Sequence, residues 1–392
     1  MAVYILAFCT VLSLAISSNC RSVRRRNVVE KRAIDKLTIK GFKSLQDVEL
    51  ELGQLNVLIG PNGAGKSNLV SYFEMLQEMA KERFQLWTAK RGGASRVLTF
   101  GADHTPQMSS EISIGENFYE FAIEHTDDDR FVFASEKALI RDGKPVHTHA
   151  SDGGNSESHC LRYVASNSGE IRVILFYSSI SDASVYHFHD TSSTAPVKLT
   201  SQLNDNRHLR KDASNLAAYL YMLKHAHEDT YDQIVNAVRL AIPFLDDFVL
   251  EPEALNANSI MLKWRHKDFD YEFIPSQLSD GSLRFICLVT ALMQPDPPST
   301  IIIDEPELGL HPYAIHLLGA LLRSASKRMQ VIVATQSPQL LDEFSIDNLI
   351  AVELVNGVSV FERLEEEDFG EWLKDFSVGE LWDKNVLGGG IP

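Results

Sequence analysis

The first recognisable pattern along the chain is an alternation of apolar and polar residues that begins near Ala33. Residues 34–39 and 48–52 alternate in this way, which predicts two β-strands joined by a turn at 41–44. Residues 55–59 form an apolar run, and the segment after the following turn has helical character to about Ala80. The folded part therefore opens with three strands and a helix.

The middle of the chain, residues 91–275, gives mixed signals. Strands are expected at 111–114, 118–124, 130–135, 171–177, 246–250, 259–264 and 269–273, and helices at 215–225 and 231–242. Residues 151–158 are rich in Ser, Gly and Asn and predict a flexible tip. We expect this block to be an inserted lobe of mixed α+β structure.

The last part of the chain alternates strands and helices. The runs 300–303 and 330–334 are short and apolar, as expected for parallel strands covered on both faces, and helices are expected at 281–293 and 312–324. This order predicts an α/β fold, a doubly wound sheet whose ligand lies at the carboxyl ends of the strands. We divide the chain into an extension, 1–32, and one domain, 33–392, with lobes 33–90, 91–275 and 276–392.

Composition narrows the protein class. With 392 residues, 44% of them hydrophobic, the chain can bury one large core or two lobes. A formal net charge of −16 argues against a broadly basic, nonspecific nucleic-acid surface, although a local basic groove is compatible with it. The 4 cysteines show no paired spacing, which predicts a reduced, cytoplasmic protein.

The N-terminus conflicts with a cytoplasmic location. Residues 1–16 are nearly all apolar and Ala15–Ser17 suits a signal peptidase, but the basic residues follow the apolar run instead of preceding it. The run is also short for a membrane span. We therefore expect an extension or a misassigned start, with Val28 or Val29 as alternative first residue and no membrane association. The alternative is a translated signal or anchor.

The Gly-rich turn after residue 59 carries the strongest chemical signal. It lies between a strand and a helix and contains Lys-Ser, which is the arrangement of a P-loop. Glycines let backbone N–H groups point at a phosphate, and the helix N-terminus adds partial positive charge. The cofactors predicted are ATP and Mg²⁺. The nucleotide-binding residues predicted are Gly60, Pro61, Asn62, Gly63, Ala64, Gly65, Lys66, Ser67 and Asn68.

Specific roles follow from residue chemistry. Lys66 is expected to reach the β- and γ-phosphates, and Ser67 to ligate Mg²⁺. Asp304 directly follows a buried strand and is expected to hold Mg²⁺ through water. Glu305 is expected to polarise the attacking water as general base.

Two further segments suit a γ-phosphate. Ser279, Asp280 and Gly281 combine a hydroxyl and a glycine at a helix N-terminus. Gln336, after the strand at 330–334, can donate a hydrogen bond but cannot take up charge, and we count it among the catalytic candidates with Glu305 and Lys66. The alternatives are an ordinary N-cap for Ser279 and a polar strand end for Gln336.

These motifs together resemble the RecF/SMC-like branch of ABC-type P-loop ATPases, and more closely the bacterial predicted AAA family ATPases. The resemblance rests on residues 39–44, 304–312 and 278–282; the last is similar to the signature Leu-Ser-Gly-Gly-Gln, from which Asp280 and Ser282 depart. It implies an ABC/RecF-like head with a mostly parallel, covered sheet and an antiparallel β subdomain.

The resemblance also implies a homodimer that sandwiches two ATP molecules. Ser279, Asp280 and Gly281 would then serve the nucleotide of the opposite subunit, and Gln336 would take the place of the switch histidine. The segment 307–311 would lie near the dimer seam. Relatives act in DNA repair, chromosome maintenance and anti-phage defence, so DNA is an expected partner.

Two functions remain open. The first is an ATP-hydrolysing dimeric switch in DNA maintenance or defence; the second is a nucleotide-gated regulator that holds an effector encoded nearby, with little turnover. A transporter subunit is disfavoured by the insert, and a fused nuclease by the roughly 50 residues after Asp342.

Two other clusters carry weaker signals. His147, His149, His159 and Cys160 fit no standard zinc spacing. The basic residues Arg207, His208, Arg210 and Lys211 could touch a phosphate backbone, or form an ordinary solvated surface.

Overall fold

The computed structural model describes residues 33–140, 147–151, 153–166 and 171–388, so the expectations for residues 1–32 lie outside the described residues. A six-stranded central sheet has the order β18-β17-β3-β16-β15-β8. Its strands are β3 (Leu55–Ile59), β8 (Ser184–Tyr186), β15 (Thr300–Asp304), β16 (Gln330–Thr335), β17 (Leu349–Val355) and β18 (Val358–Arg363). All neighbours in it are parallel except the β17–β18 hairpin.

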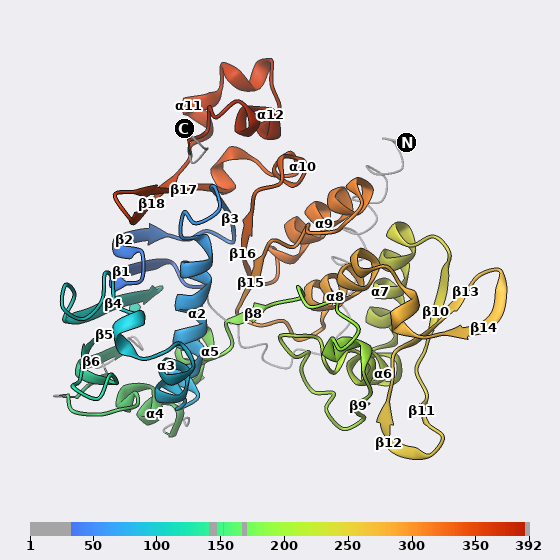
Figure 1. The fold of residues 1–392 in the computed structure, drawn as a ribbon, viewed down its shortest axis with the longest axis horizontal. Coiled ribbons are helices and arrows are strands. Elements are labelled where there is room, and N and C mark those ends of the chain that lie inside the picture. Colours follow the sequence, from blue (N-terminus) through green and yellow to red (C-terminus); the bar gives the residue numbers. More distant parts are fainter. Residues whose placement is uncertain (1–32, 141–146, 152, 167–170, 389–392) are drawn as a thin grey trace.

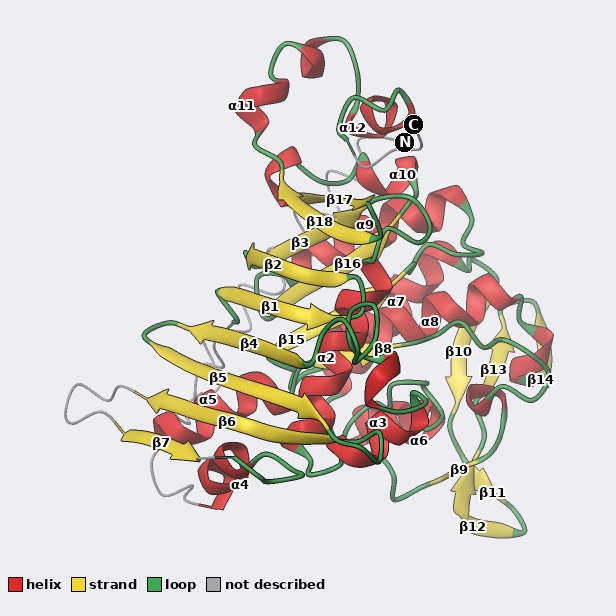
Figure 2. Cartoon of the chain, turned by 60° about the vertical axis from the view of Figure 1, so that its left-hand side comes forward, coloured by secondary structure: helices red, strands yellow, loops and turns green. Residues whose placement is uncertain are grey.

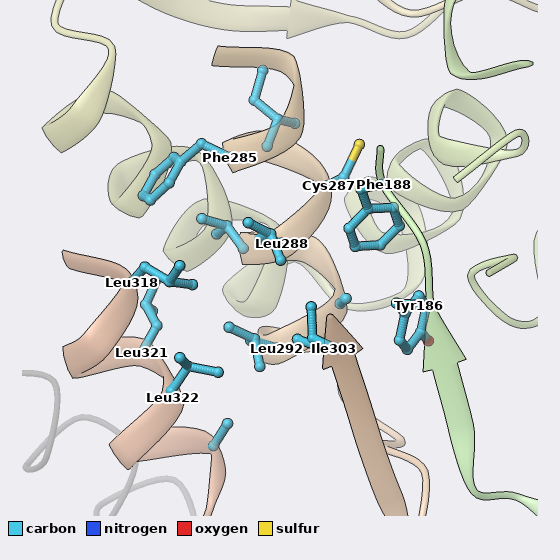
Figure 3. Packing of buried hydrophobic residues seen from close by; sticks show 14 of the residues in the cluster. Tyr186, Phe188, Phe285, Cys287, Leu288, Leu292, Ile303, Leu318, Leu321 and Leu322 are labelled. Carbon is cyan, nitrogen blue, oxygen red and sulfur yellow. The ribbon is translucent and has the colours of Figure 1, made fainter. Parts of the chain in front are cut away.

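The central strands are buried on both faces, because their alternate residues belong to two different cores. Val57, Ile301 and Ile303 pack in one core with α8 (Asp280–Met293) and α9 (Pro312–Ala325). Figure 3 shows Leu288 and Leu292 of α8 between Ile303 and the leucines of α9. Leu58 and Ile302 face the opposite core, which contains α2 (Lys66–Ala80). The continuous apolar runs in the sequence reflect this double coverage.

A second, antiparallel sheet covers the far side of α2. Its order is β2-β1-β4-β5-β6-β7, and Figure 2 shows these strands side by side from β2 to β7. The strands are β1 (Lys36–Phe42), β2 (Leu45–Glu51), β4 (Gln107–Ile114), β5 (Asn117–His125), β6 (Phe131–Ile140) and β7 (His147–Ser151). Beside it lie α3 (Phe84–Lys90), η1 (Ala94–Arg96), α4 (His159–Ser166) and α5 (Ile171–Ser181). This confirms the expected antiparallel subdomain beside a mostly parallel sheet.

A helical region with small sheets lies on the α8 side, at the right of Figure 1. It contains η2 (Pro196–Lys198), β9 (Ser201–Gln202), α6 (Leu216–Ala226), α7 (Glu228–Ala241), β10 (Leu245–Val249), β11 (Pro252–Glu253), β12 (Asn256–Ile260), β13 (Lys263–His266), β14 (Phe269–Phe273) and η3 (Pro275–Gln277). The chain ends with α10 (Pro338–Leu341), η4 (Ile346–Asn348), α11 (Glu366–Phe369), η5 (Trp372–Lys374) and α12 (Val378–Asp383). Residues 91–275 are thus divided among the antiparallel sheet, the edge of the central sheet and this helical region.

Three local expectations were wrong. Residues 171–177, expected as a strand, belong to α5, whose buried Phe176 and Ile180 are spaced as on one helix face. Residues 259–264 contribute to two strands of different sheets, β12 and β13. The region expected as a flexible tip contains Glu157, whose carboxylate accepts hydrogen bonds from the first backbone N–H groups of α3.

No helix in the described ranges is both long and apolar enough to cross a membrane. Within the same ranges, no group of three or more His, Cys, Asp or Glu side chains is placed to hold a metal ion. The backbone N–H groups of His159 and Cys160 instead bind the buried carboxylate of Glu136, at 2.8 and 3.0 Å.

Candidate nucleotide site

The P-loop joins β3 to α2 at the carboxyl edge of the central sheet. Gly63 and Gly65 have φ of 83° and 113°, in the left-handed region that favours glycine. A Cβ on Gly65 would collide with the hydroxyl of Ser359 on β18, and that hydroxyl donates to the carbonyl of Ala64 at 2.6 Å. The β17–β18 hairpin therefore contacts the outer side of the P-loop and stabilises its conformation.

Lys66 lies inside the loop. Its side chain is 5% exposed, and Nζ donates to the carbonyls of Gly60 at 2.5 Å and Pro61 at 3.1 Å. Burial lowers the pKa of Lys66, while the carboxylates of Asp304, Glu305 and Glu307 act in the opposite direction. A phosphate bound in the loop would compete with those carbonyls for the same donor.

Ser67 and Asp304 meet although they are far apart in sequence. The Ser67 hydroxyl in the first turn of α2 donates to Oδ2 of Asp304 at the end of β15, at 2.9 Å. Hydroxyl and carboxylate oxygens are hard ligands of the kind that Mg²⁺ takes together with substrate phosphates. The pair therefore fits the metal that the sequence predicts.

Gln336 connects the P-loop to the carboxylates. Its Nε2 donates to Oδ1 of Asn62 at 2.7 Å and to Oε1 of Glu305 at 3.0 Å. Glu305 has φ of 42°, which is rare for a residue with a side chain, and its N–H donates to the carbonyl of Ala334 at 2.8 Å. Strained conformations of this kind persist where the surroundings fix them, and they concentrate at functional sites.

Glu307 is a site residue that sequence reasoning placed only near a dimer seam. Its Oε1 accepts from the Thr335 hydroxyl at 2.6 Å and from the Gln336 N–H at 3.4 Å. Among the described residues, Oε2 is buried without a hydrogen-bond partner, and burial raises the pKa of this carboxyl. Glu307 therefore supports the strand end that carries Gln336. Its sequence signal was a third carboxylate beside the Asp304–Glu305 pair.

The Ser279 segment caps α8. The Ser279 hydroxyl accepts from the Ser282 N–H at 3.1 Å, and Asp280 forms an ion pair with Lys198 at 3.2 Å. A Cβ on Gly281 would collide with the carbonyl of Gly309, so the helix start packs closely against the loop after β15. These contacts give the segment the geometry of an N-cap, which leaves its role toward a nucleotide a prediction.

Arg284, one turn further along α8, was missed by the sequence analysis. The side chain is 6% exposed and donates to the carbonyls of Phe188 at 2.8 Å, His189 at 3.2 Å and Leu308. It thereby joins α8 to the segment after β8 and to the loop after β15. Burial and Arg284 lower the pKa of His189, while Asp304 and Glu305 act in the opposite direction, so this segment lies within electrostatic reach of the carboxylates.

Comparison with solved structures gives the fold. Residues of this chain superpose on an SMC head bound to the C-winged helix domain of ScpA with a TM-score of 0.57, 16% identity, and coverage of 86% of this chain and 99% of that chain. An SMC head from Pyrococcus furiosus with an extended coiled coil, bound to the C-terminal domain of ScpA, superposes with a TM-score of 0.55 and 14% identity. That match covers 88% of this chain and 99% of that chain. Identities this low indicate a shared fold.

Curated relatives match over short segments. An OLD nuclease of Thermus scotoductus is 37% identical over 43 residues, which are 11% of this chain and 8% of that protein. The chromosome partition protein Smc of Desulfitobacterium hafniense is 66% identical over 35 residues, which are 8% of this chain and 3% of that protein. The chain thus spans only a small fraction of either relative.

The family match is much longer, because residues 55–342 fit a family model described as "AAA domain, putative AbiEii toxin, Type IV TA system". That range contains the P-loop, the carboxylates after β15, Ser279 and Gln336. The family match agrees with the expected AAA family, and the structural matches show that the chain has the SMC-head fold expected from the resemblance to the RecF/SMC-like branch. The chain therefore belongs to the family of AAA domains described as putative AbiEii toxin, Type IV TA system.

Proposed function

We propose that this protein is a Mg²⁺-dependent ATPase that dimerises around ATP and acts in DNA repair, DNA maintenance or anti-phage defence. The observation that carries the proposal is the hydrogen-bonded group of Asn62, Glu305 and Gln336, beside the Ser67–Asp304 pair. The P-loop, the Ser67–Asp304 pair and the Glu305 carboxylate meet at one edge of the sheet. These are the parts that P-loop hydrolysis needs.

Each residue has one task in this proposal. Lys66 and the N–H groups of residues 60–68 bind the phosphates. Ser67 and Asp304 would hold Mg²⁺, which would supply positive charge against the charge that develops on the phosphates. Glu305 accepts a proton from the attacking water. Gln336 orients that carboxylate, and it donates to the γ-phosphate by exchanging its Asn62 contact for the phosphate.

The dimer is proposed from the fold. Ser279, Asp280 and Gly281 cap a helix on the opposite side of the sheet from α2, and their side-chain contacts are with Ser282 and Lys198. In a dimer, the Ser279 hydroxyl and the N-terminus of α8 would face the nucleotide of the second copy and could bind its phosphate. A cytoplasmic location is part of the same proposal.

A nucleotide-gated regulator is the second candidate. Both SMC heads above are described as bound to a domain of ScpA, which is a protein partner on a head of this fold. In this form the protein would close around ATP and hold an effector, with little turnover.

The test is hydrolysis of Mg-ATP by the full chain, with and without duplex DNA. Glu305→Gln should lower kcat by about 100-fold or more, because the variant cannot accept the proton. Glu362→Gln, an exposed acid on β18, is the matched control and should leave turnover unchanged. Stimulation by DNA would support a DNA transaction, whereas a slow rate that DNA leaves unchanged would favour the regulator. Glu305→Gln turnover equal to that of the unmodified chain would contradict the assigned base.

A further inference from the structure

A half-open cavity of about 340 Å³, with basic and amide side chains in its wall, lies at the end of the core opposite the P-loop. It is lined by Gln77, Lys81, Tyr186, Arg210, Lys211 and Gln294, among others. Gln77 and Lys81 are at the end of α2, whose 15 residues span roughly 22 Å from Lys66. The cavity is therefore separate from the candidate nucleotide site.

The cavity concentrates positive charge in an acidic protein. Lys81, His208, Arg210 and Lys211 line it, against two aspartates, Asp182 and Asp296, which have interactions of their own. Arg210 forms an ion pair with Asp205 at 2.5 Å, outside the lining. The basic cluster that the sequence analysis singled out thus forms one wall of a concave site.

Two of these cations lack partners. Across the described ranges, neither the Lys81 nor the Lys211 ammonium has a hydrogen bond or an ion pair within 4 Å. Lys81 is exposed and Lys211 half-buried. Desolvation lowers the pKa of both groups and the charge of Lys211 further lowers that of Lys81, while the Glu78 carboxylate acts in the opposite direction on both. Two partly desolvated ammonium groups that repel each other would be stabilised by an anion placed between them.

Uncharged polar groups complete the cavity. Gln77, Tyr186 and Gln294 are 4%, 3% and 3% exposed. Gln294 Nε2 donates to the Tyr186 hydroxyl at 3.3 Å, and Gln77 Oε1 has no hydrogen-bond partner among the described residues. The Gln77 oxygen is closed off from solvent, so in this conformation the amide is part of the cavity wall and not a contact offered to a ligand.

We propose that this cavity binds a small phosphorylated molecule of about the size of a nucleoside monophosphate. Its phosphate would lie between Lys81 and Lys211, in the part of the cavity that the basic side chains line. The volume falls in the range of small-ligand pockets. A concave site with buried amides suits a small ligand better than the backbone of a nucleic-acid duplex.

The cavity also touches the far ends of the elements that carry the nucleotide motifs. α2 begins at Lys66 and ends at this cavity, and α8 begins after Ser279 and ends at Gln294. β8 leads from Ser184 at the cavity to His189 near the carboxylates. A ligand here would therefore alter ATP turnover, a consequence that rests on the proposed ATPase function.

The link to the segment after β8 is direct. The His187 N–H donates to the carbonyl of Lys211 at 3.0 Å, and the His187 imidazole pairs with Glu74 of α2 at 2.8 Å. A shift of the Lys211 backbone on ligand binding would therefore reach the segment that Arg284 fixes at His189.

Calorimetric titration with AMP and with inorganic pyrophosphate tests the binding step, and Lys66→Ala removes the main P-loop contact. We expect the Lys66→Ala chain to bind AMP. Adding Lys81→Gln and Lys211→Gln to that chain should weaken its affinity for AMP about tenfold or more. Lys90→Gln, an exposed lysine on α3, is the matched control. Pyrophosphate binding without AMP binding would overturn the stated ligand size.

Other outcomes would overturn the proposal outright. The first is that Lys66→Ala alone abolishes AMP binding. The second is that Lys81→Gln and Lys211→Gln leave the affinity for AMP unchanged in a chain that unfolds at the normal temperature. The third is that these two substitutions weaken the binding of duplex DNA only. Because this titration needs no hydrolysis, its result stands even where the unmodified chain shows no ATP turnover. ATPase rates with and without AMP then test the coupling separately.

Discussion

The three carboxylates after β15 have different surroundings, and the surroundings decide what each can do. Asp304 faces a hydroxyl on α2, which suits a metal ligand. Glu305 accepts a hydrogen bond from the Gln336 amide, which fixes its orientation and suits the proposed role as general base. Glu307 is turned inward to Thr335, in a position that favours its neutral form. Chemical similarity in the sequence thus conceals three separate tasks.

Glu307 gives a pH prediction. Burial raises its pKa above the ordinary value of 4.5, so above that value the folded protein keeps a proton that the unfolded chain releases. Since the folded state then binds more protons, its contribution to stability is complete below pH 4.5 and falls as pH rises through the raised pKa. Urea unfolding at a series of pH values should show a smaller decline for Glu307→Gln than for the unmodified chain.

A matched pair separates titration from support of the strand end. Glu307→Gln keeps an oxygen for Thr335, whereas Glu307→Leu leaves the hydroxyl proton of Thr335 without its acceptor and should cost about 1–3 kcal/mol of unfolding free energy. Glu362→Gln serves as the exposed control. An unchanged pH profile in Glu307→Gln would show that this carboxyl does not titrate in the folded protein as we infer.

At the scale of elements, the start of α8 and the loop after β15 form one packed unit. Gly281→Ala would place a Cβ against the carbonyl of Gly309, which must then move. We expect a loss of about 1–3 kcal/mol in unfolding free energy, as for overpacking elsewhere, together with lower ATP turnover. Gly370→Ala, where the added Cβ meets only ordinary contacts, is the control for helix propensity. Equal stabilities of the two variants would contradict this packing.

The sequence predicts those elements that have one clear physical signature. β15 and β16 were predicted because strands buried on both faces are continuously apolar. We predicted a strand where α5 lies, because a short apolar run such as the one from Ile171 to Tyr177 occurs both in buried strands and in buried helices. β8 has only 3 residues and gives no periodic signal.

The site shows the same limit. Residues at the P-loop and after β15 were predicted from motifs that bind phosphate wherever they occur. The Arg284 contacts could not be predicted, because the arginine binds backbone carbonyls up to 96 positions away. Every residue has a backbone carbonyl, so the sequence does not mark which ones the arginine contacts. The role of Glu307 likewise depends on which strand end lies beside it.

At the scale of the whole molecule, one chain carries both a P-loop and a Ser279 segment, so a two-fold dimer would place each opposite the other. This arrangement makes a complementation test possible. Lys66→Ala disables the P-loop, and Ser279→Arg obstructs the segment offered to the other subunit. Each variant alone should be inactive, because every site in its dimers contains the altered residue.

A mixed dimer of these two variants contains one site with both residues intact. With random pairing, an equal mixture should therefore recover about a quarter of the wild-type rate of phosphate release. Lys66→Ala mixed with Glu305→Gln is the control: both residues act on the nucleotide of their own chain, so no site is intact and no activity should return. Recovery in the first mixture alone would support a nucleotide shared between subunits. Absence of recovery, with mixed dimers detected in Mg-ATP by light scattering, would mean that Ser279 serves its own chain or none.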